Sequence, residues 1–204
     1  MSSLDRVPAV RKSGQERFIE GEADLGFDLL SFWRWSASDI LSNATRGILA
    51  EYLVARALGV AADGVRDEWA PYDFETPDGV RVEVKSSAYL QAWFQKEMSQ
   101  VKFLVPKTRA WSAATNILSD VLTRQAEVYV FALLTHQDKA TVNPMDLKQW
   151  CFYVLPTSVL DARTRSQHSI GLANLCKLCG AVTYAQLREA VAEAARITQA
   201  SRSI

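Results

Sequence analysis

Pro71-Tyr72-Asp73, separated by nine residues from Glu83-Val84-Lys85, is the stretch that decides the fold. Residues 80–87 alternate between apolar and polar side chains, so they are predicted to form a strand with two different faces. The faces are Val80, Val82 and Val84 on one side and Arg81, Glu83, Lys85 and Ser87 on the other. Pro77-Asp78-Gly79 predicts a tight turn, because proline fixes φ and glycine allows a positive φ. Residues 72–76 therefore form the partner strand of a hairpin.

The rest of the chain predicts further elements around this hairpin. Residues 39–58 read as a largely buried helix that ends at Gly59, because apolar positions surround most of it. Residues 127–135 are a near-continuous β run, as in a central strand covered on both faces. The other predicted elements are strands at 101–105 and 150–156, a loop with a short helix at 110–125, a short helix from Thr157, and a final helix from Tyr184 to about Thr198 after the N-cap Thr183. The fold class is mixed α/β with one central sheet.

Length and composition indicate one main domain. The chain has 204 residues, 49% of them hydrophobic, which suffices for one core of ordinary size. Residues 1–27 are predicted to be a loose arm or short helix, and residues 28–35 are expected to dock on the core of a domain at 28–204. Its C-terminal extension, 140–204, contains no motif with recognisable chemistry. The absence of a bilayer-length apolar run and of a signal peptide predicts a cytoplasmic protein without membrane contact.

Charge is unevenly distributed along the chain although the net charge is zero. Residues 1–100 hold 11 Lys and Arg against 16 Asp and Glu, which gives −5, and residues 101–204 hold 12 against 7, which gives +5. An acidic half that binds a cation would thus be joined to a basic half that binds a polyanion. Chance asymmetry is the alternative explanation.

The hairpin brings together groups that can bind a hard divalent ion. Glu83 and Lys85 point the same way, roughly 7 Å apart along the strand, and strands that splay near Asp73 would bring its carboxylate beside Glu83. With the backbone carbonyl of Val84 and waters, the two carboxylates would form an oxygen-only shell that suits Mg²⁺, with Mn²⁺ as a substitute. Lys85 would orient or deprotonate a water, or neutralise developing charge on a phosphodiester.

Glu51 extends this group from the predicted helix. No basic residue lies three or four positions away on the helix, so a partner is expected from elsewhere, either the metal or Lys85. The alternatives are an ion pair with Arg46 or Arg56 and simple exposure to solvent.

These residues resemble the PD-(D/E)XK nuclease superfamily, which has the restriction-endonuclease-like fold. The resemblance covers about residues 45–135 and implies an αβββαβ core, a central mixed sheet flanked by helices. It implies that Asp73 and Glu83 bind the metal, that Lys85 is the catalytic lysine, and that Glu51 is an accessory acid. Pro71 stands one place earlier than in the strict motif, because Tyr72 separates it from the aspartate.

Other residues give weaker signals. Gln91, Arg124 and Gln125 are candidate contacts to nucleic acid, and for Gln91 a polar position on an edge strand is the alternative. Cys151, Cys176 and Cys179 are interpreted as ordinary semi-buried thiols, with zinc or redox chemistry at Cys176 and Cys179 as the alternative.

We therefore expect a Mg²⁺-dependent endonuclease that hydrolyses phosphodiester bonds in DNA, with a second copy of the chain as a candidate partner in a homodimer. The alternative is a catalytically inactive module with the same fold that binds nucleic acid or a protein partner.

Overall fold

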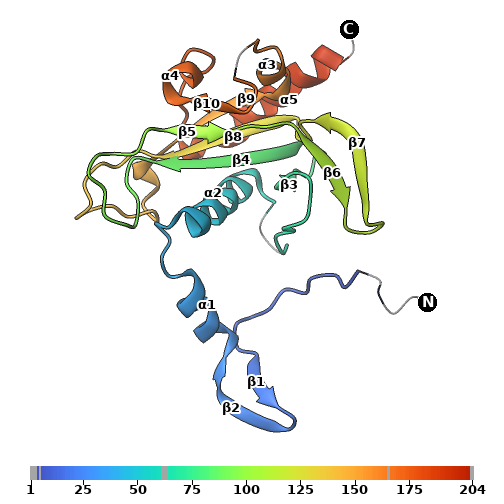
Figure 1. The fold of residues 1–204 in the computed structure, drawn as a ribbon, viewed down its shortest axis with the longest axis vertical. Coiled ribbons are helices and arrows are strands. Elements are labelled where there is room, and N and C mark those ends of the chain that lie inside the picture. The colour runs from blue at the N-terminus through green and yellow to red at the C-terminus, as the bar shows by residue number, and fades with distance from the viewer. Residues whose placement is uncertain (1–3, 5, 61–63, 165, 203–204) are drawn as a thin grey trace.

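The computed structural model describes residues 4, 6–60, 64–164 and 166–202 (Figure 1). Its helices are α1 (Leu29–Ala37), α2 (Asn43–Leu58), α3 (Thr157–Asp161), α4 (Leu172–Leu175) and α5 (Leu187–Arg202), with 3-10 turns η1 (Leu147–Gln149) and η2 (Tyr184–Gln186). Its strands are β1 (Arg17–Glu20), β2 (Ala23–Asp28), β3 (Phe74–Glu75), β4 (Arg81–Ala88), β5 (Lys102–Leu104), β6 (Thr108–Ser112), β7 (Ile117–Thr123), β8 (Val128–Leu134), β9 (Trp150–Pro156) and β10 (Ser169–Gly171).

A four-stranded mixed sheet forms the centre of the molecule, in the order β3-β4-β8-β9. Strands β4 and β8 are parallel, and the two outer pairings are antiparallel. Helices pack against this sheet, so the predicted mixed α/β class with a helix-flanked central sheet is confirmed (Figure 1).

Both faces of the sheet are covered, which explains the uninterrupted apolar sequence of β8. Even-numbered residues such as Val130 join a core beneath α2 and α5. Odd-numbered residues such as Phe131 join a second core with β5, β10, α3 and α4. Every residue of β8 is buried, so the prediction of a central strand at 127–135 is confirmed.

The hairpin that carries the motif forms as predicted, with a shorter first strand. The Gly79 N–H donates to the Thr76 carbonyl at 2.9 Å, and Gly79 adopts the positive φ of 79° that the turn requires. Strand β3 spans only Phe74–Glu75 instead of 72–76. The strand is short because the chain leaves the ladder at Asp73, whose side chain takes over the next hydrogen bond with β4.

Helix α2 ends where the sequence predicts, at Gly59, which has a φ of 80° and donates to the last carbonyls of the helix. The helix is less buried than predicted. Ile48 and Tyr52 are about half exposed, and the fully covered stripe comprises Ala50, Val54, Ala55 and Leu58. The sheet covers only one side of the helix, so apolar residues on its flank remain accessible.

Residues 110–125 form the β6–β7 hairpin, so the prediction of a loop with a short helix is wrong. Asn116 at the turn adopts a φ of 55°, which ends any helical path, and its side chain accepts a hydrogen bond from the Trp111 indole at 3.2 Å. The predicted αβββαβ order therefore lacks its second helix, because β5 and the β6–β7 hairpin fill the connection from β4 to β8. Strand β5 pairs with β10 and not with the central sheet.

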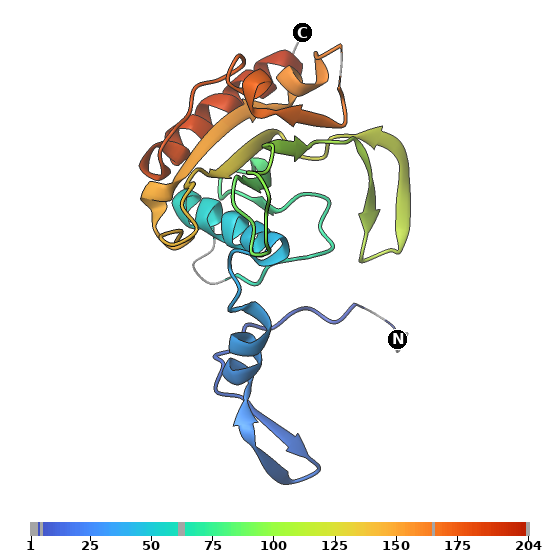
Figure 2. The ribbon, with the colours of Figure 1, turned by 60° about the vertical axis from the view of Figure 1, so that its left-hand side comes forward.

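The N-terminal region differs most from the expectation. Residues 17–28 form the β1–β2 hairpin instead of a loose arm or short helix. Helix α1 has no buried residue, so residues 28–35 do not dock on the core as predicted. The hairpin and α1 project away from the central sheet (Figures 1 and 2). At the other end of the chain, Thr183 caps the 3-10 turn η2, and the final α-helix starts at Leu187 instead of Tyr184, ends at Arg202 and packs on the sheet.

Candidate active site

Asp73 lies at the edge of the central sheet, where β3 stops and the β4 backbone becomes accessible. Its own N–H donates to the Val82 carbonyl at 3.1 Å. Its carboxylate accepts a hydrogen bond from the Val84 N–H at 2.6 Å. In an antiparallel ladder the N–H and C=O of a residue leave the strand on the same side. The Val84 carbonyl therefore faces the same edge as the Asp73 carboxylate.

Glu83 and Lys85 project from β4 on the face opposite α2. The Lys85 Nζ forms an ion pair with the Glu83 Oε1. Their side chains are 17% and 30% exposed for Glu83 and Lys85, respectively, so the pair is accessible but partly shielded. Across the parallel ladder, Glu83 is paired with Tyr129 and Lys85 with Phe131, so aromatic residues of β8 neighbour the ion pair.

Electrostatics join Asp73 to the other predicted site residues. The pKa of Asp73 is raised to about 7, first by burial and then by the negative charges of Glu83 and Glu51, while the Val84 hydrogen bond and Lys85 oppose the rise. Asp73 therefore lies within the field of both acids and of the lysine. Its carboxylate is short of compensating positive charge, and a cation bound there would supply it.

Glu51 reaches this cluster from α2, on the other face of the sheet. Its partner is Arg66, whose Nη2 lies 3.3 Å from the Glu51 Oε1 and whose Nε also contacts the carboxylate. Neither Arg46 nor Arg56, the alternative partners expected from the sequence, pairs with Glu51. Arg46 is buried, and its guanidinium donates to Asn43 and to the Leu41 carbonyl. Sequence reasoning missed Arg66, since nothing in its local pattern distinguishes it from other loop arginines.

A pocket of about 430 Å³ separates α2 from the segment that leads into β3. Glu51, Arg66 and Asp73 lie on its walls. The remaining lining is mainly apolar and includes Ile48, Tyr52, Ala55, Val60, Val65, Ala70, Tyr72 and Phe74. The charged groups thus border a hollow large enough for a small organic group.

The donors present fit a Mg²⁺ ion that keeps part of its water shell. In the part of the chain that the structure describes, no three His, Cys, Asp or Glu side chains form a metal-binding group. Two carboxylates and one carbonyl, from Asp73, Glu83 and Val84, are the candidate oxygen donors near the sheet edge. Mg²⁺ commonly takes one or two carboxylates and completes its shell with waters and phosphate oxygens.

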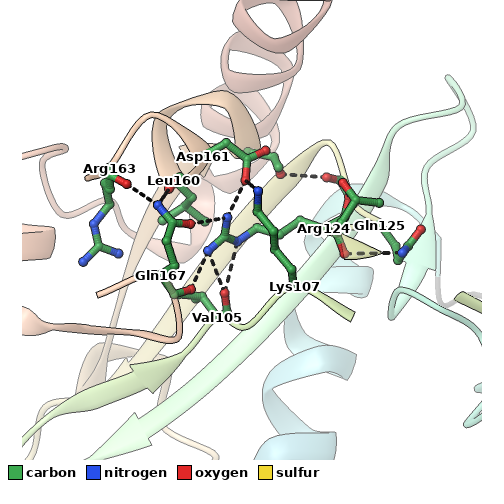
Figure 3. Close-up of polar contacts among 11 residues, drawn as sticks. Val105, Lys107, Arg124, Gln125, Leu160, Asp161, Arg163 and Gln167 are labelled. Atoms are coloured by element: carbon green, nitrogen blue, oxygen red, sulfur yellow. Dashed lines mark hydrogen bonds and ion pairs between the residues drawn. The ribbon is translucent and has the colours of Figure 1, made fainter. Parts of the chain in front are cut away.

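Arg124 has a structural position that does not suit the predicted contact to nucleic acid. Its side chain is 0% exposed, and its guanidinium donates to the Val105 and Gln167 carbonyls at 2.8 and 2.7 Å. The same guanidinium forms an ion pair with Asp161 (Figure 3). These bonds link the end of β7 to β5 and to the segment after α3.

The other two predicted contacts also make internal hydrogen bonds. Gln91 is buried, and its amide donates to the Ala88 carbonyl and the Ser99 hydroxyl at 3.2 and 3.1 Å. Gln125 is partly exposed, and it donates to the Thr108 carbonyl at 3.1 Å, at the base of the β6–β7 hairpin (Figure 3). Neither side chain points its donors toward Asp73.

The three cysteines gather around β9. Cys176 donates from its sulfur to the Tyr153 hydroxyl at 3.7 Å. Burial raises the pKa of Cys179 to about 11 and also raises that of Cys151, so both stay in the thiol form at neutral pH. Cys151 and Cys179 are half-buried, as the interpretation of semi-buried thiols predicts, whereas Cys176 is exposed.

The sequence matches the family model described as bacteriophage T4 endonuclease IV over residues 29–173. The chain belongs to this endonuclease family. The matched range contains all four acidic and basic residues of the predicted site, and it omits the β1–β2 hairpin and α5. No curated protein matches the chain.

Membership of the T4 endonuclease IV family supports an endonuclease function, with nucleic acid as the substrate. Across the described residues, no helix has the length and apolar character needed to cross a membrane.

Proposed function

We propose that the protein is a Mg²⁺-dependent DNA endonuclease of the PD-(D/E)XK type, with Asp73, Glu83 and Lys85 as its catalytic residues. The observation that carries the proposal is the carboxylate of Asp73, held at the edge of β4 in the field of two further acids. The match to an endonuclease family supports the same reaction class.

The oxygen donors at the sheet edge define which groups would bind the Mg²⁺ ion. Asp73, Glu83 and the Val84 carbonyl are the proposed ligands, and Mn²⁺ should substitute because it accepts the same oxygen donors. When bound, the ion supplies a nucleophilic water at neutral pH and neutralises charge on the phosphodiester. Asp73 must lose its proton to take part, so a pKa of about 7 makes the site sensitive to pH near neutrality.

Lys85 and Arg66 supply positive charge on opposite sides of the acidic group. Lys85 is oriented by the Glu83 carboxylate, and we assign its ammonium the role of neutralising charge that develops on the phosphate. Arg66 is held by Glu51 at the wall of the pocket that also contains Asp73. Its Nε and Nη2 donate to Glu51, and we assign its remaining N–H groups a contact to a phosphate oxygen of the DNA backbone, in place of Arg124.

Cleavage of plasmid DNA tests the proposal directly. The wild-type protein should nick or linearise plasmid in Mg²⁺ or Mn²⁺ and lose this activity when a chelator is added. Lys85→Ala should reduce the rate by at least about a hundredfold, as expected for loss of an electrostatic catalytic group. Lys148→Ala, at an exposed lysine on η1, is the matched control and should cleave normally.

Calorimetric titration with Mn²⁺ separates the proposal from an inactive nuclease-fold module. Wild-type protein should bind the ion, and Asp73→Ala should not. Metal binding without cleavage of any DNA form would favour the module, whereas cleavage that persists in Lys85→Ala would overturn the role of the lysine.

A further inference from the structure

Tyr129 in β8 is a buried tyrosine on the face of the sheet that carries the proposed catalytic residues. The parallel pairing of β4 with β8 makes Tyr129 the register partner of Glu83 (Figure 1). The valines on either side of Glu83 and of Tyr129 join the core beneath α2 and α5, so strand alternation turns both residues to the opposite face. The two side chains therefore leave neighbouring strands side by side, from backbones roughly 5 Å apart.

The ring of Tyr129 is buried in the second core, whereas its hydroxyl has no hydrogen-bond partner. The residue is 4% exposed, and its ring packs on Phe131 at a centroid distance of 6.2 Å. Within the described ranges, no residue donates to this hydroxyl or accepts from it, and Arg163 Nη1 is the one side-chain polar atom that is both sealed from solvent and unpartnered. The unpartnered Tyr129 hydroxyl is therefore open to solvent, although its ring is not.

Core packing does not account for this hydroxyl. Phenylalanine fills an apolar core without a polar atom, as Phe131 does two positions later in the same strand. Tyr153, a second buried tyrosine of that core, uses its hydroxyl internally, as the acceptor of the Cys176 thiol at 3.7 Å. Polar groups of buried residues are normally hydrogen-bonded, so the free hydroxyl beside Glu83 indicates an acceptor that binds from outside.

Electrostatics place the Tyr129 hydroxyl close to the proposed site. The pKa of Tyr129 is raised, first by burial and then by the negative charge of Glu83. Arg124 opposes the rise, whereas Asp161 and Asp73 add to it. The hydroxyl thus lies within the field of both acids that are proposed to bind the metal, and at neutral pH it is an uncharged hydrogen-bond donor.

A tyrosine side chain is longer than a glutamate side chain, so the phenol extends past the neighbouring carboxylate. In the proposed function, a phosphate held beside Glu83 presents its oxygens there. We propose that Tyr129 is a further catalytic residue of this reaction, whose hydroxyl donates a hydrogen bond to a non-bridging oxygen of the scissile phosphate. The inference rests on the proposed function. No proton is transferred, and the bond strengthens as negative charge develops on that oxygen in the transition state.

Plasmid cleavage measured over a range of DNA concentrations tests this role. Tyr129→Phe removes only the hydroxyl, so kcat should fall about 10- to 100-fold while KM changes less than about threefold, as expected for loss of one hydrogen bond to a charged group in the transition state. Tyr153→Phe is the matched control, because it removes the hydroxyl of another buried tyrosine in the same core, and it should cleave at the wild-type rate.

Two measurements that do not depend on cleavage accompany the kinetics. In urea unfolding, Tyr129→Phe should be at least as stable as wild type, because the hydroxyl has no partner within the protein to lose. In calorimetric titration, Tyr129→Phe should bind Mn²⁺ as wild type does, because the phenol is not a proposed ligand. A less stable variant would show that the hydroxyl has an internal partner, and weaker Mn²⁺ binding would assign it to the metal site; either result would contradict the contact to phosphate.

The kinetic outcomes separate this inference from the proposed function. Cleavage by Tyr129→Phe at the wild-type rate would overturn the role of Tyr129 and leave the proposed endonuclease intact. A wild-type protein that cleaves no DNA in Mg²⁺ or Mn²⁺ would refute both.

Discussion

Replacing Asp73 by Asn should stabilise the protein at alkaline pH while it abolishes the proposed metal site. In the folded protein the Asp73 carboxylate is partly buried beside Glu83 and Glu51, and its pKa is about 7. In the unfolded chain the same group returns to its ordinary value of 3.8. The folded state therefore holds the proton more tightly, and stability is lost as the pH rises from about 4 to 7. Asparagine carries no charge to desolvate, and its carbonyl can still accept the hydrogen bond from Val84.

The size of the effect follows from the two pKa values. The difference between about 7 and 3.8, at 1.36 kcal/mol per pKa unit, corresponds to about 4 kcal/mol at a pH above 7. Solvent access and local relaxation reduce the penalty at a site that is only partly buried. We expect Asp73→Asn to raise the free energy of unfolding by roughly 1–3 kcal/mol above neutrality, with the gain shrinking toward zero near pH 4.

Urea unfolding in chelator-containing buffers, followed by circular dichroism across this pH range, measures the difference. Asp78→Asn is the matched control, because Asp78 is an exposed aspartate in the adjoining turn and its substitution should have little effect. Equal stability of Asp73→Asn and wild type at high pH would refute the reasoning, as would a gain that does not depend on pH. Either result would mean that ionised Asp73, beside Glu83 and Glu51, does not destabilise the folded state.

Three other predictions concern the site and the core. Cleavage in Mg²⁺ should increase as the pH rises through about 7, because Asp73 must be ionised to bind the ion, and a rate that is flat from pH 6 to 8 would contradict this assignment. Glu51→Gln should weaken DNA binding, measured by fluorescence anisotropy, because it removes the ion pair that holds Arg66 in place. Arg66→Ala should weaken DNA binding by a similar factor. If only Glu51→Gln weakens binding, Arg66 is not the contact to DNA. Arg124→Ala should destabilise the fold by about 1–3 kcal/mol in urea unfolding, because it removes the buried donor to the Val105 and Gln167 carbonyls, whereas unchanged stability would rule out that structural role.

Local sequence determined the elements whose cause lies within a few residues. The alternation at 80–87 gave β4, Gly79 and Gly59 gave a turn and a helix end, and the apolar run at 127–135 gave the central strand. These features depend on backbone conformations and side-chain periodicity, which neighbours along the chain largely decide. The spacing of Asp73, Glu83 and Lys85 likewise placed the three residues on one hairpin.

Tertiary structure decided what depends on distant partners. The raised pKa of Asp73 arises from burial and from Glu51 on another element, and the pairing of Glu51 with Arg66 has no local signal. Arg124 appeared equally suited to a phosphate contact until the fold enclosed it among backbone carbonyls. The helix expected at 110–125 gave way to a hairpin, and the apolar residues at 28–35 stayed outside the core. Desolvation and long-range contacts cannot be read from local periodicity, because they depend on which segments the fold brings together.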